Sequence, residues 1–372
     1  MKTCEAGADA IVAGAGIWGC TVARRLAEAG RKVLVLEKRA AVGGNCRCET
    51  DPETGIEVHV YGSHIFHTRN EEVWGFANRF AKFNDYRHSV LARYKGRTYH
   101  LPIGCTLLRE FFGRDLKPSE LNEADREAIF EAFIRGYTSK QWGVPPEKVP
   151  ASVIARLKVR DSFSTDYFDD PHQGIPADGY NAMFERMLDH PNITVECNRE
   201  FTISNIRTFE HSNIYYSGPI DALFEYKFGP LPWRTLNFEL ETLSCSDFQG
   251  ASVVNHTEAG VPYTRIHEFR HYHPESGGGL HPTIGQSSNL NNRTIIMREY
   301  PKTWEMGDEP YYPVDNPESS ALLKKYQDEL EHFNRTIEQS NNRAILHVGG
   351  RLGGFKYYDM DQAVSAALAV EV

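Results

Sequence analysis

Residues 10–37 read AIVAGAGIWGCTVARRLAEAGRKVLVLE, and this stretch decides the fold class. Residues 10–13 are apolar and predict a buried strand, which runs into the G-x-G-x-x-G turn of residues 14–19. Residues 20–28 have the apolar spacing of an amphipathic helix that ends at Gly30, and residues 32–36 predict a second strand. Strand, glycine turn, helix and strand within about 30 residues are the order of a βαβ unit in a parallel sheet.

Each glycine of this turn meets a different physical demand. Gly14 permits the tight turn, Gly16 lets backbone N–H groups approach a pyrophosphate at the helix N-terminus, and Gly19 lets the helix pack closely on the strand. Glu37 ends the second strand, where a carboxylate accepts hydrogen bonds from ribose hydroxyls and favours a ribose without phosphate. The unit therefore predicts binding of FAD or NAD. The alternative is a glycine-rich turn in an ordinary α/β domain.

The residues beyond Glu37 favour FAD over NAD. Lys38 follows the acid, and Gly43, Gly44 and Asn45 belong to a second glycine loop, of the kind that wraps the diphosphate in FAD proteins. Near the other end of the chain, residues 347–351 (HVGGR) predict a strand that enters a glycine turn, and residues 361–370 predict a closing helix. A strand, glycine turn and helix late in the chain that return to the flavin are a second feature typical of FAD proteins.

Composition excludes several classes of function. The chain has 372 residues, 41% of them hydrophobic, which fits a globular protein of two or three domains. Lys and Arg number 41 and Asp and Glu 50, a net charge of −9, so we expect neither nucleic acid nor a membrane as partner. The seven irregularly spaced cysteines predict free thiols in a cytoplasmic protein. Cys46 and Cys48 have no partner pair, so we expect no metal site.

The rest of the chain predicts two inserts within the cofactor domain. Residues 71–83 and 107–157 have helical apolar spacing, whereas short alternating runs between residues 234 and 298 predict an antiparallel sheet. We therefore expect an α/β fold in which an interrupted cofactor domain carries one helical insert and one sheet insert.

Blocks of sequence across almost the whole chain resemble the bacterial UDP-galactopyranose mutases, in that family's order. The blocks are YGSHIFHT (61–68), GYTSKQWG (136–143), QGIP (173–176), GPIDALFEYKF (218–228), VPYTRI (261–266), REYP (298–301), GDEPYYPV (307–314) and GGRLGGFKYYDM (349–360). The resemblance implies three domains: an FAD-binding Rossmann-like domain (1–70, 178–225 and 340–372), a helical bundle with a mobile substrate loop (71–177) and a twisted antiparallel sheet (226–339).

The resemblance also implies a reaction, the interconversion of pyranose and furanose forms of a nucleotide sugar such as UDP-galactose, in glycan biosynthesis. In that family N5 of the reduced flavin attacks C1 of the sugar, the ring opens and recloses, and the diphosphate returns without net redox. We therefore expect FAD, active when reduced, an external reductant such as NAD(P)H, a UDP- or dTDP-hexose substrate and a homodimer, the assembly family members often form. A redox flavoenzyme on the same fold and a mutase-like protein with an altered substrate stay open as alternatives.

Residue by residue, the resemblance implies roles at matching positions. The residues expected to take part in catalysis are His64, His67, Arg298 and Arg351. The expected substrate-binding residues are Asn84, Tyr137, Gln141, Trp142, Tyr180, Arg265, Arg298, Tyr312, Tyr357 and Asp359, with Arg265 and Arg298 on the diphosphate. The expected cofactor-binding residues are Gly14, Gly16, Gly19, Glu37, Lys38, Gly43, Gly44, Asn45, His64, Gly350, Arg351 and Met360.

One stretch departs from the family's pattern. The family carries an arginine shortly before QGIP, whereas this chain has Pro171 there, after Asp169 and Asp170. Asp178 and Asn181 stand where the family usually has glycine and threonine, and the loop at residues 275–292 looks longer than usual. Four interpretations of these departures stay open: harmless drift, closure by other groups, a different nucleotide sugar, and loss of mutase activity with retention of FAD.

Overall fold

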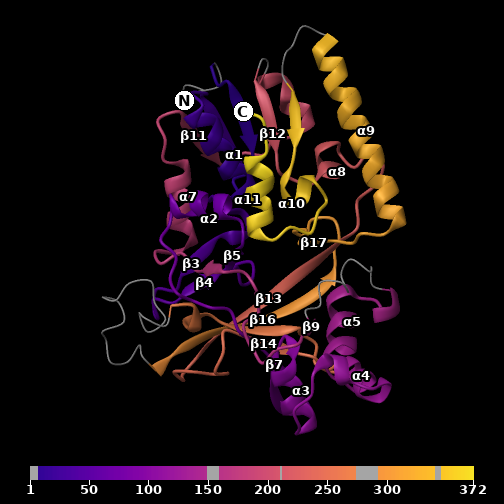
Figure 1. Cartoon of the computed structure of the whole chain (residues 1–372). Coiled ribbons are helices and arrows are strands. Elements are labelled where there is room, and N and C mark those ends of the chain that lie inside the picture. Colours follow the sequence, from indigo (N-terminus) through magenta and orange to yellow (C-terminus); the bar gives the residue numbers. More distant parts are fainter. Residues whose placement is uncertain (1–6, 149–158, 210–211, 274–291, 340–344) are drawn as a thin grey trace.

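The computed structural model describes residues 7–148, 159–209, 212–273, 292–339 and 345–372. Figure 1 shows a parallel sheet with its helices in the upper half of the molecule, and a larger sheet with a group of helices in the lower half. The long loop expected at residues 275–292 lies outside the described residues, except for residue 292.

A five-stranded parallel sheet forms the centre of the upper half. Its strands in spatial order are β11 (Ile193–Cys197), β2 (Val33–Glu37), β1 (Ala10–Ala13), β12 (Asn213–Tyr216) and β18 (Leu346–Val348). All neighbouring pairs are parallel. Every residue of β1 and β2 is buried, as expected for a sheet covered by helices on both faces. The Rossmann-like α/β fold predicted from the glycine turn is thereby confirmed.

Each face of this sheet packs against its own hydrophobic core, because successive side chains of a strand point to opposite faces. Val12 and Val35 belong to the core on one face, whereas Ile11 and Leu36 belong to the core on the other. Helices on the first face are α1 (Ile17–Glu28), α7 (Gly179–Leu188) and α11 (Met360–Leu368); those on the second are α8 (Ile220–Leu223) and α9 (Pro317–Gln339).

A seven-stranded sheet forms the centre of the lower half. Its strands in spatial order are β17 (Tyr312–Pro313), β13 (Trp233–Leu243), β16 (Thr294–Thr303), β15 (Arg265–Glu268), β14 (Val253–His256), β6 (Val90–Tyr94) and β7 (Arg97–Leu101). The β14–β6 pair is parallel and the other pairs are antiparallel. The long strands β13 and β16 cross the molecule as a twisted ribbon (Figure 1). This sheet is the antiparallel insert that the alternating runs predict.

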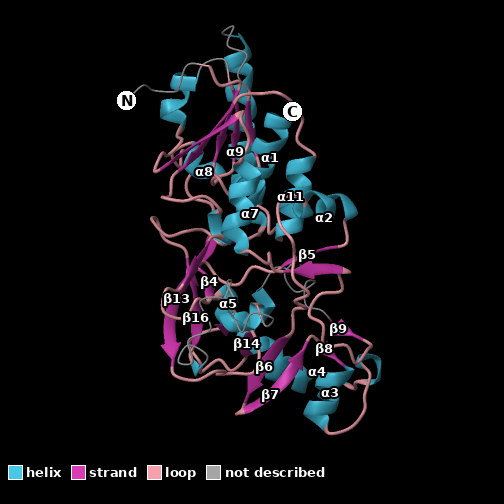
Figure 2. Cartoon of the chain, turned by 90° about the vertical axis from the view of Figure 1, so that its left-hand side faces the viewer, coloured by secondary structure: helices cyan, strands magenta, loops and turns pink. Residues whose placement is uncertain are grey.

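Helices cover the β6–β7 end of the larger sheet (Figure 2). They are α3 (Cys105–Phe112), α4 (Glu123–Ile129), a π-helical turn (Phe130–Arg135) and α5 (Gly136–Trp142). Their apolar side chains, among them Leu107, Leu108 and Phe133, enclose Ala92 of β6 and Tyr99 of β7, two strands that form a hairpin. The helical insert and the hairpin therefore share one core.

Two segments pack against a different part of the molecule from the domain to which the sequence assigns them. The β6–β7 hairpin falls within residues 71–177, yet it extends the larger sheet. Helix α9 falls within residues 226–339, yet its Tyr326 packs in the core of the parallel sheet. The division into three domains itself stays a prediction.

The remaining strands form three short pairs, and the remaining helices are short. The paired short strands are β3 (Cys48–Thr50) with β4 (Glu57–His59), β5 (Phe66–Thr68) with β10 (His172–Gly174), and β8 (Ile103–Gly104) with β9 (Val159–Arg160). The remaining helices are α2 (Glu71–Asn78), α10 (Gly350–Gly353) and 3₁₀ turns that include η1 (Gly44–Cys46) and η6 (Phe269–Tyr272). The described cysteines are free thiols, as predicted. None of the described helices is both long and apolar enough to span a membrane.

Gly19→Ala should destabilise the protein, because its Cβ would lie 1.9 Å from the carbonyl oxygen of Gly14. That oxygen belongs to the backbone of the turn and cannot move without separating α1 from β1. We expect a loss of about 2–3 kcal/mol in the free energy of unfolding, measured by urea denaturation. Gly75→Ala is the matched control: no atom lies within 4 Å of its Cβ, so the helical preference of alanine should stabilise α2 by up to about 1 kcal/mol. A Gly19→Ala protein as stable as the parent would contradict this packing.

Candidate functional site

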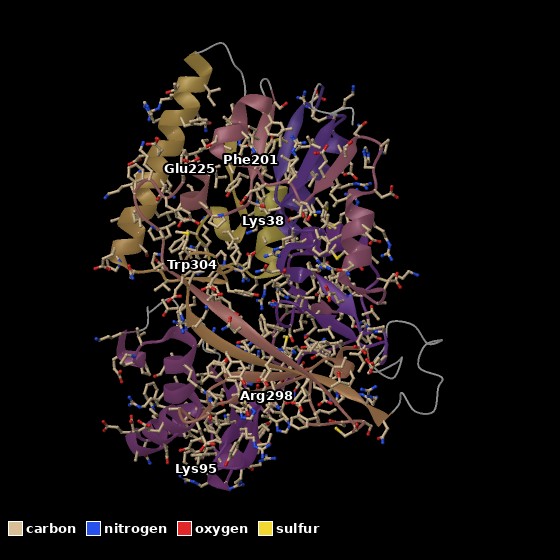
Figure 3. The ribbon with its side chains drawn as sticks, turned by 180° about the vertical axis from the view of Figure 1, so that it is seen from behind. Lys38, Lys95, Phe201, Glu225, Arg298 and Trp304 are labelled. Atoms are coloured by element: carbon tan, nitrogen blue, oxygen red, sulfur yellow. The ribbon has the colours of Figure 1, made fainter. Side chains whose placement is uncertain are left out.

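A cavity of about 350 Å³ lies at the carboxyl ends of β1 and β12. Chain order reverses there, with β2 and β11 to one side and β18 to the other, and ligands of open α/β sheets bind at such a point. Every residue expected to bind the cofactor lines this cavity: Gly14, Gly16, Gly19, Glu37, Lys38, Gly43, Gly44, Asn45, His64, Gly350, Arg351 and Met360. Figure 3 shows Lys38, Phe201 and Trp304 in the half that holds the cavity and Arg298 in the other half.

The glycine turn leaves its backbone open to a ligand. Gly14 has φ +102°, and a Cβ there would lie 2.2 Å from Ser217 Oγ. Gly44 has φ +55°, and its Cβ would lie 2.8 Å from Gly16 Cα. A Cβ on Gly16, in contrast, would have no neighbour nearer than 3.8 Å. The two glycine loops thus fit closely against each other, while Gly16 itself faces open space that suits the diphosphate of a dinucleotide.

Glu37 ends β2 and lines the cavity. Its side chain is buried, and its two oxygens accept hydrogen bonds from the backbone N–H groups of Ala15 (2.8 Å) and Arg39 (2.9 Å). Each carboxylate oxygen keeps a second lone pair for a ribose hydroxyl. The carboxylate is therefore fixed in place before a ligand binds.

The two cations next to Glu37 share one carboxylate. Glu309 pairs with Lys38 Nζ at 3.3 Å and with Arg39 Nη2 at 2.9 Å. Each cation thus already has a carboxylate partner within the protein. Glu309 also brings the segment at residues 304–310 over the cavity, where several of its residues form part of the lining.

His64 also lines the cavity and is held by the backbone. Its Nδ1 lies 2.7 Å from the carbonyl oxygen of Gly62, so Nδ1 carries the hydrogen and Nε2 is an acceptor in the neutral ring. Removal from water, together with the neighbouring His59 ring and the positive charge of Arg351, lowers the pKa of His64 to about 3. The ring is therefore a neutral acceptor at pH 7.

Arg351 connects the cavity to a group of aromatic rings. Its guanidinium donates to the carbonyl oxygens of Tyr358 (2.9 Å) and Tyr311 (3.4 Å) and lies 6.0 Å from the ring centre of Tyr312 and 5.7 Å from that of Tyr357. Tyr312, Tyr357 and Trp142 form what we call the aromatic cluster, with ring centres 5.2–6.5 Å apart. These three expected substrate residues are thus brought together beside Arg351.

A second arginine lies close to this cluster within a buried polar network. Arg265 donates to the Tyr137 hydroxyl and pairs with Glu299 Oε1 at 3.3 Å. Glu299 is buried, but the charge of Arg265 and the hydrogen bond from His267 hold its pKa below the ordinary value. Burial raises the pKa of Tyr137, so this hydroxyl keeps its own hydrogen. We call Arg265, Tyr137, Glu299, His267 and Ser63 the Arg265 network.

His267 and Ser63 fix the other end of the Arg265 network. Burial lowers the pKa of His267, so its neutral ring donates from Nε2 to Glu299 at 3.3 Å and accepts at Nδ1 from Ser63 Oγ at 2.5 Å. The Tyr272 hydroxyl donates to Ser63 in turn. Since Ser63 directly precedes His64 in the chain, the Arg265 network adjoins the His64–Arg351 part of the cofactor cavity.

Arg298, expected beside Arg265 on the same diphosphate, lies on the other face of the sheet. Arg265 pairs with Glu299 across β15 and β16, and the side chain of Arg298 therefore points away from that face. It forms an ion pair with Glu241 at 2.8 Å instead. The structure thus separates the two arginines.

Other expected residues are held in structural contacts away from the cavity. His67 stacks on Phe168 with ring centres 3.6 Å apart and bonds to Asp170 at 2.7 Å. Asn84 accepts from the N–H of Ile175 at 2.9 Å. Tyr180 is fully buried in the core against the ring of His59.

Gln141 and Asp359 complete the expected set. Gln141 is buried on α5, and its backbone carbonyl accepts from Arg234 Nε at 2.9 Å. Asp359 lines the cavity and caps α11, where its N–H donates to Gln362 Oε1 at 2.9 Å. Asp359 therefore lies nearer the cofactor end than the Arg265 network.

The stretch around Pro171 is tied down by ion pairs. Asp169 pairs with Arg160 at 2.7 Å, and Asp170 pairs with Arg69 at 2.9 Å and with His67. The negative charge of these two carboxylates is thus largely balanced. The neighbouring His172 bonds to Glu71 at 2.8 Å.

Several residues that line the cavity or order the site are absent from the sequence-based set. They are Arg199, Phe201, Ser217, Trp304, Glu309, Ser63, His267 and Glu299. Ser217 follows β12 directly, so the rule that ligands bind at the carboxyl ends of parallel strands could have found it. The pairing of Glu299 with Arg265 depends on strand register, which one sequence does not fix.

Comparison with known proteins agrees with this geometry. The family profile described as UDP-galactopyranose mutase matches residues 132–357, and one described as an NAD(P)-binding Rossmann-like domain matches residues 12–80. A probable UDP-galactopyranose mutase of Klebsiella pneumoniae is 36% identical over 96% of this chain and 92% of its own length. The dTDP-fucopyranose mutase of Escherichia coli is 34% identical over 96% of each chain.

A solved structure shares the fold. The crystal structure of reduced UDP-galactopyranose mutase superposes with a TM-score of 0.69, covers 97% of this chain and 92% of that chain, and is 16% identical in sequence. With the family profile spanning more than half of the residues and curated relatives spanning nearly all of them, this chain belongs to the UDP-galactopyranose mutase family.

Proposed function

We propose that this chain is a flavin-dependent nucleotide-sugar mutase that interconverts the pyranose and furanose forms of a UDP- or dTDP-hexose, with reduced FAD as its cofactor. The observation that carries the proposal is the position of the Arg265 network and the aromatic cluster beside the His64–Arg351 part of the cofactor cavity. The enzyme class, an isomerase, follows from the family of mutases to which the chain belongs.

The residues of the cavity suit a flavin dinucleotide. The open backbone at Gly16 would accept the diphosphate at the N-terminus of α1, and Glu37 would accept from a ribose. His64 would offer an unprotonated Nε2 and Arg351 a cation at the reactive end. When bound in its reduced state, the flavin supplies a nucleophile for the anomeric carbon of the sugar.

The Arg265 network would bind the leaving and returning diphosphate. Arg265 is held by Glu299 and Tyr137 before the substrate arrives, so little side-chain entropy is lost on binding. The aromatic cluster supplies a largely apolar wall that excludes water from the opened sugar. These contacts orient the sugar and hold the diphosphate nearby while the ring opens and recloses.

The nucleotide and the hexose are both left open by the comparisons. One relative is named for UDP-galactopyranose and another, almost as similar, for dTDP-fucopyranose. We keep UDP-galactose and a dTDP-6-deoxyhexose as the two candidate substrates. NAD(P)H as reductant, a homodimer and a cytoplasmic location stay predictions.

The assay that tests the proposal incubates the flavin-loaded protein with UDP-galactofuranose and, separately, with dTDP-fucofuranose, before and after dithionite reduction. We expect conversion of at least one of them to its pyranose form only after reduction, measured by chromatography. Peroxide production by the unreduced protein, without ring conversion, would indicate a redox flavoenzyme. No conversion of either sugar by the reduced protein would contradict the proposed mutase.

The two Arg–Glu pairs on opposite faces of the sheet provide a matched comparison. Arg265→Lys should lower kcat/KM by roughly 10²-fold, because a lysine cannot reproduce the two-point contact with a diphosphate. Arg298→Lys should leave kcat/KM near the parent value, because the side chain pairs with Glu241 away from the network. Equal losses in the two variants would show that Arg298 also reaches the substrate.

The neutral ring of His64 makes stability depend on pH. The pKa of His64 is lowered from 6.5 to about 3 in the folded state. As the pH falls below 6.5, His64 therefore becomes protonated in the unfolded chain but stays neutral in the folded chain. Stability attributable to His64 should fall by at most about 1.4 kcal/mol per pH unit in that range. Urea denaturation at pH 7, 6 and 5 should show a shallower decline in His64→Gln than in the parent. His332→Gln, on the exposed face of α9, is the control and should keep the parent slope. A parent slope in His64→Gln would refute the assignment.

A further inference from the structure

Three potential ligand side chains converge at the far end of the larger sheet, outside the site described above. Asp247 lies in the loop between β13 and β14, Glu268 ends β15, and His271 lies in η6. One atom of each side chain lies within 4.8 Å of the other two. His271 Nε2 lies 3.4 Å from Asp247 Oδ1 and 3.4 Å from Glu268 Oε2.

His271 Nε2 lies at ion-pair distance from both carboxylates. The atom is buried, yet it makes no well-aligned hydrogen bond with either carboxylate, and the spacing also suits ligands around an ion. Ligand atoms bound tetrahedrally at about 2.0–2.2 Å from a zinc ion are separated by roughly 3.4 Å. Both separations from His271 Nε2 have this value.

The two carboxylates are oriented by their own hydrogen bonds. Glu268 is fully buried; its Oε1 accepts from Thr294 Oγ1 at 2.7 Å and its Oε2 from the N–H of Gln249 at 3.0 Å. Asp247 Oδ1 accepts from the N–H of Gly250 at 2.6 Å. Such outer contacts are typical of carboxylates that bind metals. The Asp247 side chain is 48% exposed, which leaves a route for an ion and room for a water ligand.

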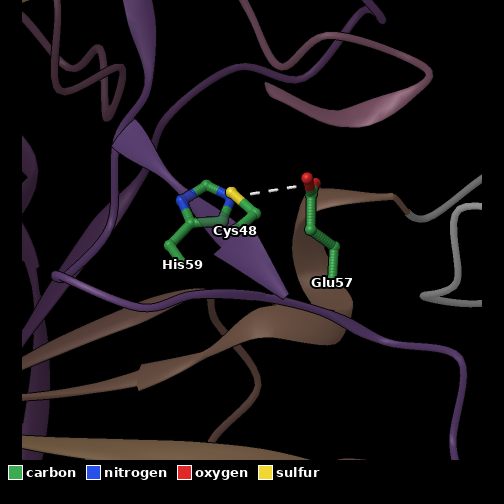
Figure 4. Close-up of side chains that lie close together, drawn as sticks. All are labelled: Cys48, Glu57 and His59. Atoms are coloured by element: carbon green, nitrogen blue, oxygen red, sulfur yellow. Dashed lines mark ion pairs between the residues drawn. The ribbon is translucent and has the colours of Figure 1, made fainter. Parts of the chain in front are cut away.

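A second group of metal-type ligands has a different chemistry. Cys48, Glu57 and His59 lie together in the core (Figure 4). His59 Nδ1 accepts from the N–H of His64 at 3.0 Å, so its hydrogen sits on Nε2, the atom that faces Glu57. His273 Nε2 also bonds to Glu57, at 2.9 Å. That group is a carboxylate surrounded by donors, and it leaves His59 no lone pair for a metal.

We propose that Asp247, Glu268 and His271 bind one divalent cation of the Zn²⁺ type, with water in the fourth position. One imidazole and two carboxylates are ligands that zinc accepts, whereas Ca²⁺ prefers a larger set of oxygens at longer distances. The ion would join the β13–β14 loop to η6 at the end of β15 and stabilise that edge of the sheet. This site is separate from the proposed catalytic function.

The test is isothermal titration of ZnCl₂ into untagged, EDTA-treated, flavin-loaded protein that carries Cys245→Ser, which removes a thiol near Asp247 in the sequence. We expect one saturable site and a higher melting temperature with Zn²⁺. His271→Gln and Asp247→Asn should each weaken binding by at least about 10-fold, the size of effect that even outer-shell changes cause. His332→Gln, at an exposed histidine on α9, should bind like the parent.

Three results would overturn the assignment. They are the absence of a saturable Zn²⁺ site, a site that His271→Gln leaves unchanged, and binding of CaCl₂ without binding of ZnCl₂. Circular dichroism and the bound flavin absorbance of each variant would show that it is folded, so loss of binding could not come from unfolding.

Discussion

The close backbone contacts at the switch point of the parallel sheet are the constraint on which the rest of the structure depends. Gly19 must lie against the carbonyl of Gly14, and Gly44 against Gly16, before α1 can begin at the carboxyl end of β1. No side chain larger than hydrogen fits at these contacts. They leave the N-terminus of α1 open to a ligand, and they fix where the cavity forms.

Around the cavity, individual ion pairs set the local charge, although the protein as a whole is acidic. The chain carries a net charge of −9, yet the proposed ligands are anionic diphosphates. Acids close to the site are balanced by named partners: Glu309 by Lys38 and Arg39, and Glu299 by Arg265. Arg351 lines the cavity and bonds to backbone carbonyls instead, and these neutral partners do not cancel its charge. The N-terminus of α1, Arg265 and Arg351 can attract a diphosphate although the net charge of the protein repels it.

The Rossmann-like fold and the residues that line its cavity could be predicted from the sequence, for a physical reason. A glycine turn, a terminal acid and a late glycine loop are local requirements, so each is visible in a few consecutive residues. The substrate half depends on register between distant strands. Arg265 and Arg298 both lie in strands and look equivalent in the sequence. In the sheet, however, Arg265 lies opposite Glu299, the residue after Arg298, so the two arginines point to opposite faces. Likewise, Glu299, His267 and Ser63 come from three separate segments, and only the fold brings them together.

The central claim is that the face of the sheet carrying Arg265 receives the diphosphate of a nucleotide sugar beside the flavin cavity. A crystal structure of the reduced, flavin-loaded protein with UDP bound measures this directly. We expect diphosphate oxygens within hydrogen-bond distance of the Arg265 guanidinium, with the β-phosphate, which carries the hexose in the substrate, directed toward His64 and Arg351. A diphosphate bound on the opposite face, against Arg298 and Glu241, would contradict the account.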